Sequence, residues 1–244
     1  MVGAGQTKGR RTDVLKCEPG LLKSAIDCGT YGATSARSQD RTRQWHSAGW
    51  IGLGGGRGLG EAAWRAVVRS AAPKGKVTAL TERLLEHFEV ASIDDLIYIR
   101  SSRTTRHRRT EHTGTVLDRL HGIEGLSRIV LDAAEQGDKV ALRIVREEAK
   151  NLAKYALFAA HEVGIEVDRE FPLVLLGGVF KHQCPLLPDA VAERVQKKAP
   201  GARRQRGLLE PVCGAAILAL EGAGEPVDDK VRANLLHTCP SFDT

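Results

Sequence analysis

The pattern of hydrophobic positions in this chain changes near residue 60. From Glu61 onward, apolar residues recur at intervals of three and four, which predicts amphipathic helices over residues 61–72, 78–88, 125–137 and 139–163. Asp138 precedes the longest of these segments and Gly164 follows it, as expected of a helix N-cap and a C-terminal glycine. The chain beyond residue 60 therefore predicts a helix-rich domain.

A different pattern marks the predicted sheet. Residues 171–180, with the sequence FPLVLLGGVF, form a continuous apolar run, which is typical of a strand in a parallel sheet covered on both faces. Helices are predicted to follow at residues 185–199 and 211–222, and the second should be central because it is apolar nearly all round. The alternation of strand and helix predicts an α/β fold.

Two regions lack such periodicity. Up to Trp45 the chain is rich in Gly, Ser, Thr, Arg and Gln, and residues 49–60 are Gly-rich, so residues 1–60 are interpreted as a loop-rich N-terminal segment. Residues 100–122 hold five arginines before Thr110 and few apolar side chains, which indicates an exposed insertion. The remaining domain is then expected to span residues 61–244.

Composition adds limits on the class of protein. Hydrophobic residues make up 42% and charged residues 27% of the 244 residues, which is ordinary for a globular chain. The formal net charge of +6 suits a protein that meets phosphates. Five cysteines without zinc-like spacing predict reduced thiols. We find no apolar run long enough for a membrane span and no signal-peptide pattern, so a cytoplasmic protein is expected.

The two glycines that end the apolar strand are the first candidate for chemistry. Gly177 and Gly178 should lie at the carboxyl edge of the sheet, where ligands bind in open α/β folds. Glycine lets the backbone come close to a base, ribose or phosphate, and a following helix N-terminus supplies amide donors. The same two glycines are also explained by a tight turn that binds no ligand. On the local sequence alone, this second interpretation is slightly favoured.

Several runs together carry a family resemblance. GEAAWRAVVRSA, LTERLLEHF, DDLIYI, LDAAEQGDKVALRIV, LVLLGGVF, PLLPDAV and LEPVCGAAILALE occur in this order. The order resembles that of the BadF/BadG/BcrA/BcrD-type ATPases and N-acetylglucosamine kinases. The resemblance implies the two-lobed fold of actin, hexokinase and the heat-shock chaperone ATPase domain. The chain would supply mainly the ribonuclease H-like C-terminal lobe, with the N-terminal lobe largely missing.

The same resemblance implies ATP with Mg²⁺, and either phosphoryl transfer to an amino-sugar hydroxyl or ATP hydrolysis. The expected nucleotide-binding positions are Gly177, Gly178, Val179, Gly214, Gly29 and Thr30. Those expected near a sugar are Gly49 and Trp50. Family members often form homodimers, so a homodimer is a further expectation.

The chain also departs from the family pattern. Gly5, Thr7 and Lys8 only weakly match the first phosphate hairpin, and the acidic GDEGSG run of the sugar site has no counterpart. Asp13 is the one candidate for the catalytic aspartate, although its surroundings fit poorly. A truncated or frame-disturbed, non-catalytic remnant, or an accessory subunit, is therefore the alternative hypothesis.

Two further interpretations were weighed. Residues 58–63 match the dinucleotide-binding pattern GxGxxA, but no apolar strand precedes them, so a flexible loop before a helix is favoured. The arginines of residues 100–122 could neutralise nucleic-acid phosphates, yet the segment offers no aromatic side chain for base stacking. A solvated insertion is favoured over a nucleic-acid site.

Overall fold

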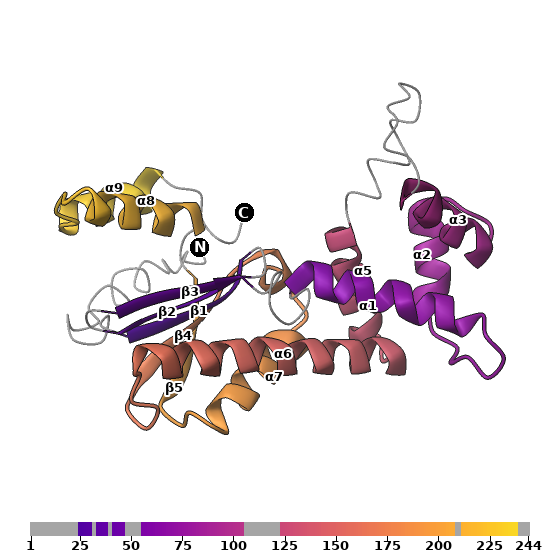
Figure 1. The fold of residues 1–244 in the computed structure, drawn as a ribbon, viewed down its shortest axis with the longest axis horizontal. Coiled ribbons are helices and arrows are strands. Elements are labelled where there is room, and N and C mark those ends of the chain that lie inside the picture. The colour runs from indigo at the N-terminus through magenta and orange to yellow at the C-terminus, as the bar shows by residue number, and fades with distance from the viewer. Residues whose placement is uncertain are drawn as a thin grey trace, which may run out of the picture.

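The computed structural model describes residues 24–30, 33–38, 41–46, 55–104, 123–207 and 211–238. These residues form a mixed α/β, helix-rich structure around a five-stranded sheet of order β3-β2-β1-β4-β5 (Figure 1). The strands are β1 (Ser24–Thr30), β2 (Ala33–Ser38), β3 (Arg41–His46), β4 (Phe171–Leu175) and β5 (Ala202–Arg206). The pairs β1–β2 and β2–β3 are antiparallel, whereas β4 runs parallel to both β1 and β5.

The expectation that this part of the chain is loop is wrong, because residues 24–46 contain the strands β1, β2 and β3. Their sequences, SAIDCGT, ATSARS and RTRQWH, carry few aliphatic residues and no clear alternation. Pairing along the whole length of β2, from Ala33 opposite His46 to Ser38 opposite Arg41, holds them as a meander instead. Backbone pairing between neighbouring strands, which no local period reveals, therefore decides their structure.

The helix α6 (Lys139–Val163) confirms the predicted boundaries of the longest helix. At its start, Asp138 accepts hydrogen bonds from the amides of Val140 and Ala141 at 2.9 and 2.8 Å. Its carboxylate also accepts from the Thr78 hydroxyl at 3.0 Å and the Ala79 amide at 2.8 Å, just before α2 (Leu80–Phe88). Burial alone would raise the pKa of Asp138, but these hydrogen bonds outweigh it and lower the pKa.

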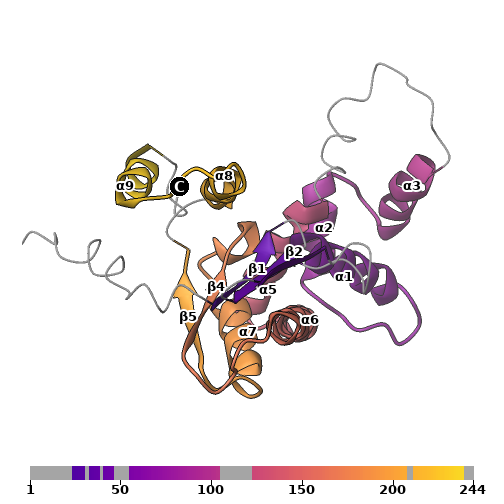
Figure 2. The ribbon, with the colours of Figure 1, turned by 60° about the vertical axis from the view of Figure 1, so that its left-hand side comes forward.

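The core is built around α6. Figure 2, which looks nearly along this helix, shows α6 and α7 (Leu186–Gln196) side by side on one face of the sheet. Phe171, Leu173 and Leu175 of β4 and Leu187 and Val191 of α7 are buried there. Both faces of β4 are covered, since four of its five residues are buried and Val174 is half-buried, which confirms the strand predicted from its apolar run.

A second group of helices packs at the N-terminal end of α6 (Figure 1). It contains α1 (Gly55–Ser70), α2, α3 (Ile93–Thr104), the short 3₁₀ helix η4 (Ile123–Gly125) and α5 (Leu126–Glu135). Because α3 extends to Thr104, the first five residues of the expected Arg-rich insertion are helical. Arg100 among them is ion-paired to Glu61 at 2.8 Å, and its guanidinium lies 5.0 Å from the ring centre of Trp64.

The two C-terminal helices differ from expectation. α8 (Pro211–Gly222) and α9 (Asp229–Thr238) lie on the other side of the sheet from α6 and α7 (Figures 1 and 2). Cys213 is buried, but Gly214, Ala215 and Ala219 are exposed, and the core cluster contains none of the described side chains of α8. An apolar sequence had predicted a central position, which the described residues do not show.

The described part of the Gly-rich run also differs from expectation, because α1 begins at Gly55 and includes Gly55, Gly56, Gly58 and Gly60, which had predicted a flexible loop. Gly60 is buried at the point where α1 meets η4. A Cβ atom built on Gly60 would lie 1.9 Å from the carbonyl oxygen of Ile123. The close approach of the two backbones explains this glycine, and its position inside a helix removes the dinucleotide-binding interpretation of residues 58–63.

We expect Gly60→Ala to lower the free energy of unfolding by about 1–3 kcal/mol, because the backbone of η4 must move to admit the methyl group. Gly214→Ala is the control, since a Cβ atom there meets nothing within 4 Å and alanine favours the helix by up to about 1 kcal/mol. Urea unfolding of both variants measures the difference. Equal stability of Gly60→Ala and the unchanged chain would contradict the close approach.

Candidate functional site

The carboxyl edge of β1 and β4 gathers four of the residues singled out in the sequence. β1 and β4 are parallel neighbours, and Cys28 pairs with Leu175. Gly29 and Thr30 follow Cys28 at the end of β1, and Gly177 and Gly178 follow closely after Leu175. The topology therefore brings two segments almost 150 residues apart to one edge of the sheet, where ligands bind in parallel α/β sheets.

The backbone after β4 makes a tight turn. Gly177 has φ 104° and ψ 165°, a conformation open essentially to glycine. Its carbonyl oxygen accepts from the Phe180 amide at 3.0 Å and begins the 3₁₀ turn η5 (Gly178–Phe180). A Cβ atom built on Gly178 meets nothing within 4 Å, whereas the Val179 side chain is buried in the core. A ligand at this turn would therefore meet Gly178 rather than the side chain of Val179.

A pocket of about 370 Å³ opens beside this turn. Leu175 and Phe180 form an apolar part of its wall, while Lys181 and Arg204 bring positive charge from the loop after η5 and from β5. Arg204 also forms an ion pair with Asp189 of α7, which orients its guanidinium. An apolar wall with cations at its rim suits a molecule that has a flat apolar part and an anionic part.

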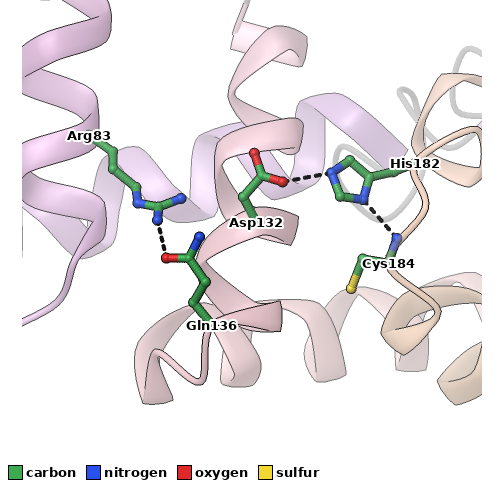
Figure 3. Close-up of polar contacts among 5 residues, drawn as sticks. All are labelled: Arg83, Asp132, Gln136, His182 and Cys184. Carbon is green, nitrogen blue, oxygen red and sulfur yellow. Dashed lines mark hydrogen bonds and ion pairs between the residues drawn. The ribbon is translucent and has the colours of Figure 1, made fainter.

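His182 fixes the loop that lines this pocket (Figure 3). Its Nδ1 accepts from the Cys184 amide at 3.0 Å, so Nε2 carries the proton and donates it to Asp132 Oδ1, also at 3.0 Å. Asp132 lies on α5, and the contact fastens the loop after β4 to the second group of helices. Arg83 of α2 likewise donates to Gln136 beyond the end of α5. Sequence reasoning missed His182 and Asp132, because no motif links positions 50 residues apart.

The other candidate residues lie elsewhere. Gly214 is an exposed residue in the first turns of α8 and is not part of the pocket wall. Asp13, Gly49 and Trp50 lie outside the described residues, as do Gly5, Thr7 and Lys8. Within the part of the chain that the structure describes, no helix is long and apolar enough to cross a membrane.

Comparisons with known proteins point to sugar kinases. The chain is 26% identical over 205 residues to an N-acetyl-D-glucosamine kinase of Dictyostelium discoideum, a match covering 82% of this chain and 60% of the relative. The predicted similarity to N-acetylglucosamine kinases is therefore confirmed, and the chain spans about 60% of that relative's length. No family model matches the chain.

Two solved structures match part of this chain. They are candidate N-acetylglucosamine kinases from Porphyromonas gingivalis and Chromobacterium violaceum, with TM-scores of 0.47 and 0.46 and identities of 13% and 14%. Each match covers 76% of this chain, and they cover 56% and 57% of the respective structures.

A buried acid lies apart from the pocket, between α6 and α1. Glu148 of α6 is only 5% exposed and accepts a hydrogen bond from the Gly55 amide at 2.5 Å. Burial raises the pKa of Glu148 from 4.5 to about 7, although the bond to Gly55 acts in the opposite direction. Near neutral pH this carboxyl is therefore partly protonated.

The raised pKa of Glu148 predicts a pH-dependent stability. Below pH 4.5 the carboxyl is protonated in both the folded and the unfolded chain, and it costs the fold nothing. As the pH rises toward 7 the unfolded chain ionises first, so the folded state loses up to about 3 kcal/mol. Glu148→Gln keeps an acceptor for Gly55 and should exceed the unchanged chain in stability by that amount at pH 8, but not at pH 4.

Urea unfolding between pH 4 and pH 8 measures this difference. Glu147→Gln is the matched control, because the neighbouring side chain is exposed and its removal should leave no such trend. A difference between Glu148→Gln and the unchanged chain that stays constant over this range would show that Glu148 ionises normally.

Proposed function

We propose that this chain is the nucleotide-binding lobe of an ATP-dependent phosphotransferase that acts on an amino-sugar hydroxyl, as N-acetylglucosamine kinases do. The sequence similarity to the kinase of Dictyostelium discoideum supports the class of reaction. The order β3-β2-β1-β4-β5, with a three-stranded meander beside two parallel strands, supports a ribonuclease H-like lobe of the actin and hexokinase type.

The observation that carries the proposal is the shared edge of β1 and β4. Thr30 ends β1 opposite Ala33 of β2, and the Gly177–Gly178 turn ends β4 at the same edge. Phosphate groups are commonly held by backbone amides in such connections, and a base or ribose can lie against a glycine that has no side chain. Lys181 and Arg204 at the adjoining pocket would neutralise phosphate charge.

The residues of this pocket suit a nucleotide but offer no carboxylate to hold a metal ion. The apolar wall of Leu175 and Phe180, the two cations and the open face of Gly178 fit a nucleotide. A Mg²⁺ ion in such enzymes is usually held by one or two carboxylates together with the phosphates. The wall of this pocket contains no carboxylate, and the described residues hold no cluster of three or more acidic, His or Cys side chains suited to a metal. We therefore assign no Mg²⁺ ligand here.

Phosphoryl transfer depends chiefly on positioning and on charge neutralisation. The described residues would contribute to both, through the glycine edge and through Lys181 and Arg204. The wall of the pocket offers no carboxylate that could accept the sugar hydroxyl proton, and Asp13, which lies outside the described residues, stays the candidate for this base. The pocket without carboxylates also favours a second candidate function, a chain that binds nucleotide without catalysing transfer.

Replacing Gly178 tests the nucleotide site without disturbing the fold. A ligand at about 100 times its dissociation constant stabilises the native state by roughly 2.7 kcal/mol, which thermal unfolding with millimolar Mg-ATP detects. Gly178→Leu should unfold at the unchanged temperature without nucleotide, because its Cβ atom meets nothing within 4 Å. The shift caused by Mg-ATP should be lost, because the side chain fills the space that the nucleotide needs.

Gly125→Leu is the matched control, since Gly125 is also exposed with nothing within 4 Å of its Cβ position. If Mg-ATP still raises the unfolding temperature of Gly178→Leu, the nucleotide binds at another site. If Mg-ATP does not raise the unfolding temperature of the unchanged chain, nucleotide binding is rejected. Transfer of labelled phosphate from ATP to N-acetylglucosamine then separates the two candidate functions. Binding without transfer would favour the non-catalytic one.

A further inference from the structure

A second recess lies away from the sheet edge, between α1 and the N-terminal half of α6. We call it the α1–α6 groove; its volume is about 750 Å³, and the loop of residues 72–76 after α1 closes one end. None of its lining residues belongs to the pocket beside β4. Basic side chains line it from three segments: Arg65, Arg69, Lys74, Lys76 and Arg143.

The acids of the groove do not neutralise these cations. Glu61 stands four residues before Arg65, a spacing at which the two would normally pair on a helix, but Glu61 is bonded to Arg100 at 2.8 Å. Glu147 stands four residues after Arg143 and is paired instead with Lys150, at 3.4 Å.

Glu148, the third acid of the groove, is buried against the Gly55 amide and carries only part of a charge near neutral pH. Within the described part of the chain, none of the five groove cations has a carboxylate within ion-pair distance. The five basic side chains of the groove outnumber its three acids, so the described part of the groove is positively charged.

The loop that closes the groove is held in a strained shape. Lys74 has φ 67°, a left-handed conformation that is uncommon for a residue with a side chain. The Gly75 amide donates to the Ala72 carbonyl at 2.7 Å, and a Cβ atom on Gly75 would lie 2.4 Å from the Arg69 carbonyl oxygen. The turn is thus folded tightly onto the end of α1. Residues held in this region of backbone conformation occur at ligand sites as well as in turns.

We propose that the α1–α6 groove is a second anion site, which binds a small molecule carrying several phosphate groups. Its volume lies in the range of small-molecule sites. Three arginines and two lysines converge on it, and both side chains form strong charge-assisted hydrogen bonds with phosphate oxygens. The site is separate from the proposed nucleotide site and does not depend on phosphoryl transfer.

Titration calorimetry of the full chain with inorganic tripolyphosphate, without metal ions, tests the proposal. We expect saturable binding to one site, weakened at least tenfold in the double variant Arg69→Ala, Arg143→Ala. Arg146→Ala is the matched control, because Arg146 lies three residues from Arg143 on the same helix, is exposed and does not line the groove. It should leave the affinity unchanged to within twofold.

The variant Lys74→Gly tests whether Lys74 acts through its charge or through the conformation of the loop. Glycine relieves the left-handed conformation, so the variant should unfold at the same or a higher temperature. It should nevertheless bind tripolyphosphate several-fold more weakly, because a phosphate donor has been removed. A purely structural role of Lys74 would change the unfolding temperature and leave the affinity alone.

Three results would overturn the proposal. An equal loss of affinity for tripolyphosphate in Arg146→Ala and in the groove variant would show diffuse attraction to a basic protein. Loss of binding in Arg204→Ala, with the groove variant unaffected, would place the anion in the pocket beside β4. Binding of a single-stranded RNA at low salt, without binding of tripolyphosphate, would mean that the groove serves a polymer.

Discussion

The burial of α6 is the constraint on which the rest of the structure depends. This helix contacts the strands β1, β2 and β3 and the helices α1, α5 and α7, so the sheet and the second group of helices are both positioned by it. Small buried residues allow the close packing: Ala149, Ala153, Ala156 and Ala160 recur along its buried surface. Asp138 fixes where the helix begins and also holds the start of α2. Helix α6 therefore forms one wall of the α1–α6 groove and supports α7 and the sheet, which carry the pocket beside β4.

Sequence patterns predicted the elements whose buried face follows a period. The boundaries of α6 followed from Asp138 and Gly164, and β4 followed from an unbroken apolar run before two glycines. The same run located the Gly177–Gly178 turn, because a glycine pair after a buried strand has a local signature. The structure of these residues can therefore be predicted from the few residues on either side of them.

The failures have a common physical cause, which is pairing and packing that leave no local pattern in the sequence. The strands β2 and β3 are polar, and they are held by pairing with each other and by packing against α6. Helix α1 begins among glycines, which disfavour helix by themselves. Gly60 is needed there because the backbone of α1 lies close to that of Ile123. His182 and Asp132 meet across 50 residues without a motif. For α8 an apolar composition was taken as evidence of burial, yet most of its described side chains are at least partly exposed.

The charge of the α1–α6 groove shows how core packing can determine a surface property. Trp64 is almost fully buried between α1 and its neighbours, and its ring lies edge-on to Phe88 of α2. The guanidinium of Arg100 lies over that ring and is thereby held beside Glu61. Glu61 is consequently occupied and cannot neutralise Arg65 one turn further along α1. The groove is basic because five cations line it, and the packing around Trp64 adds to this by pairing Glu61 with Arg100. The net charge of the chain alone would not have located it.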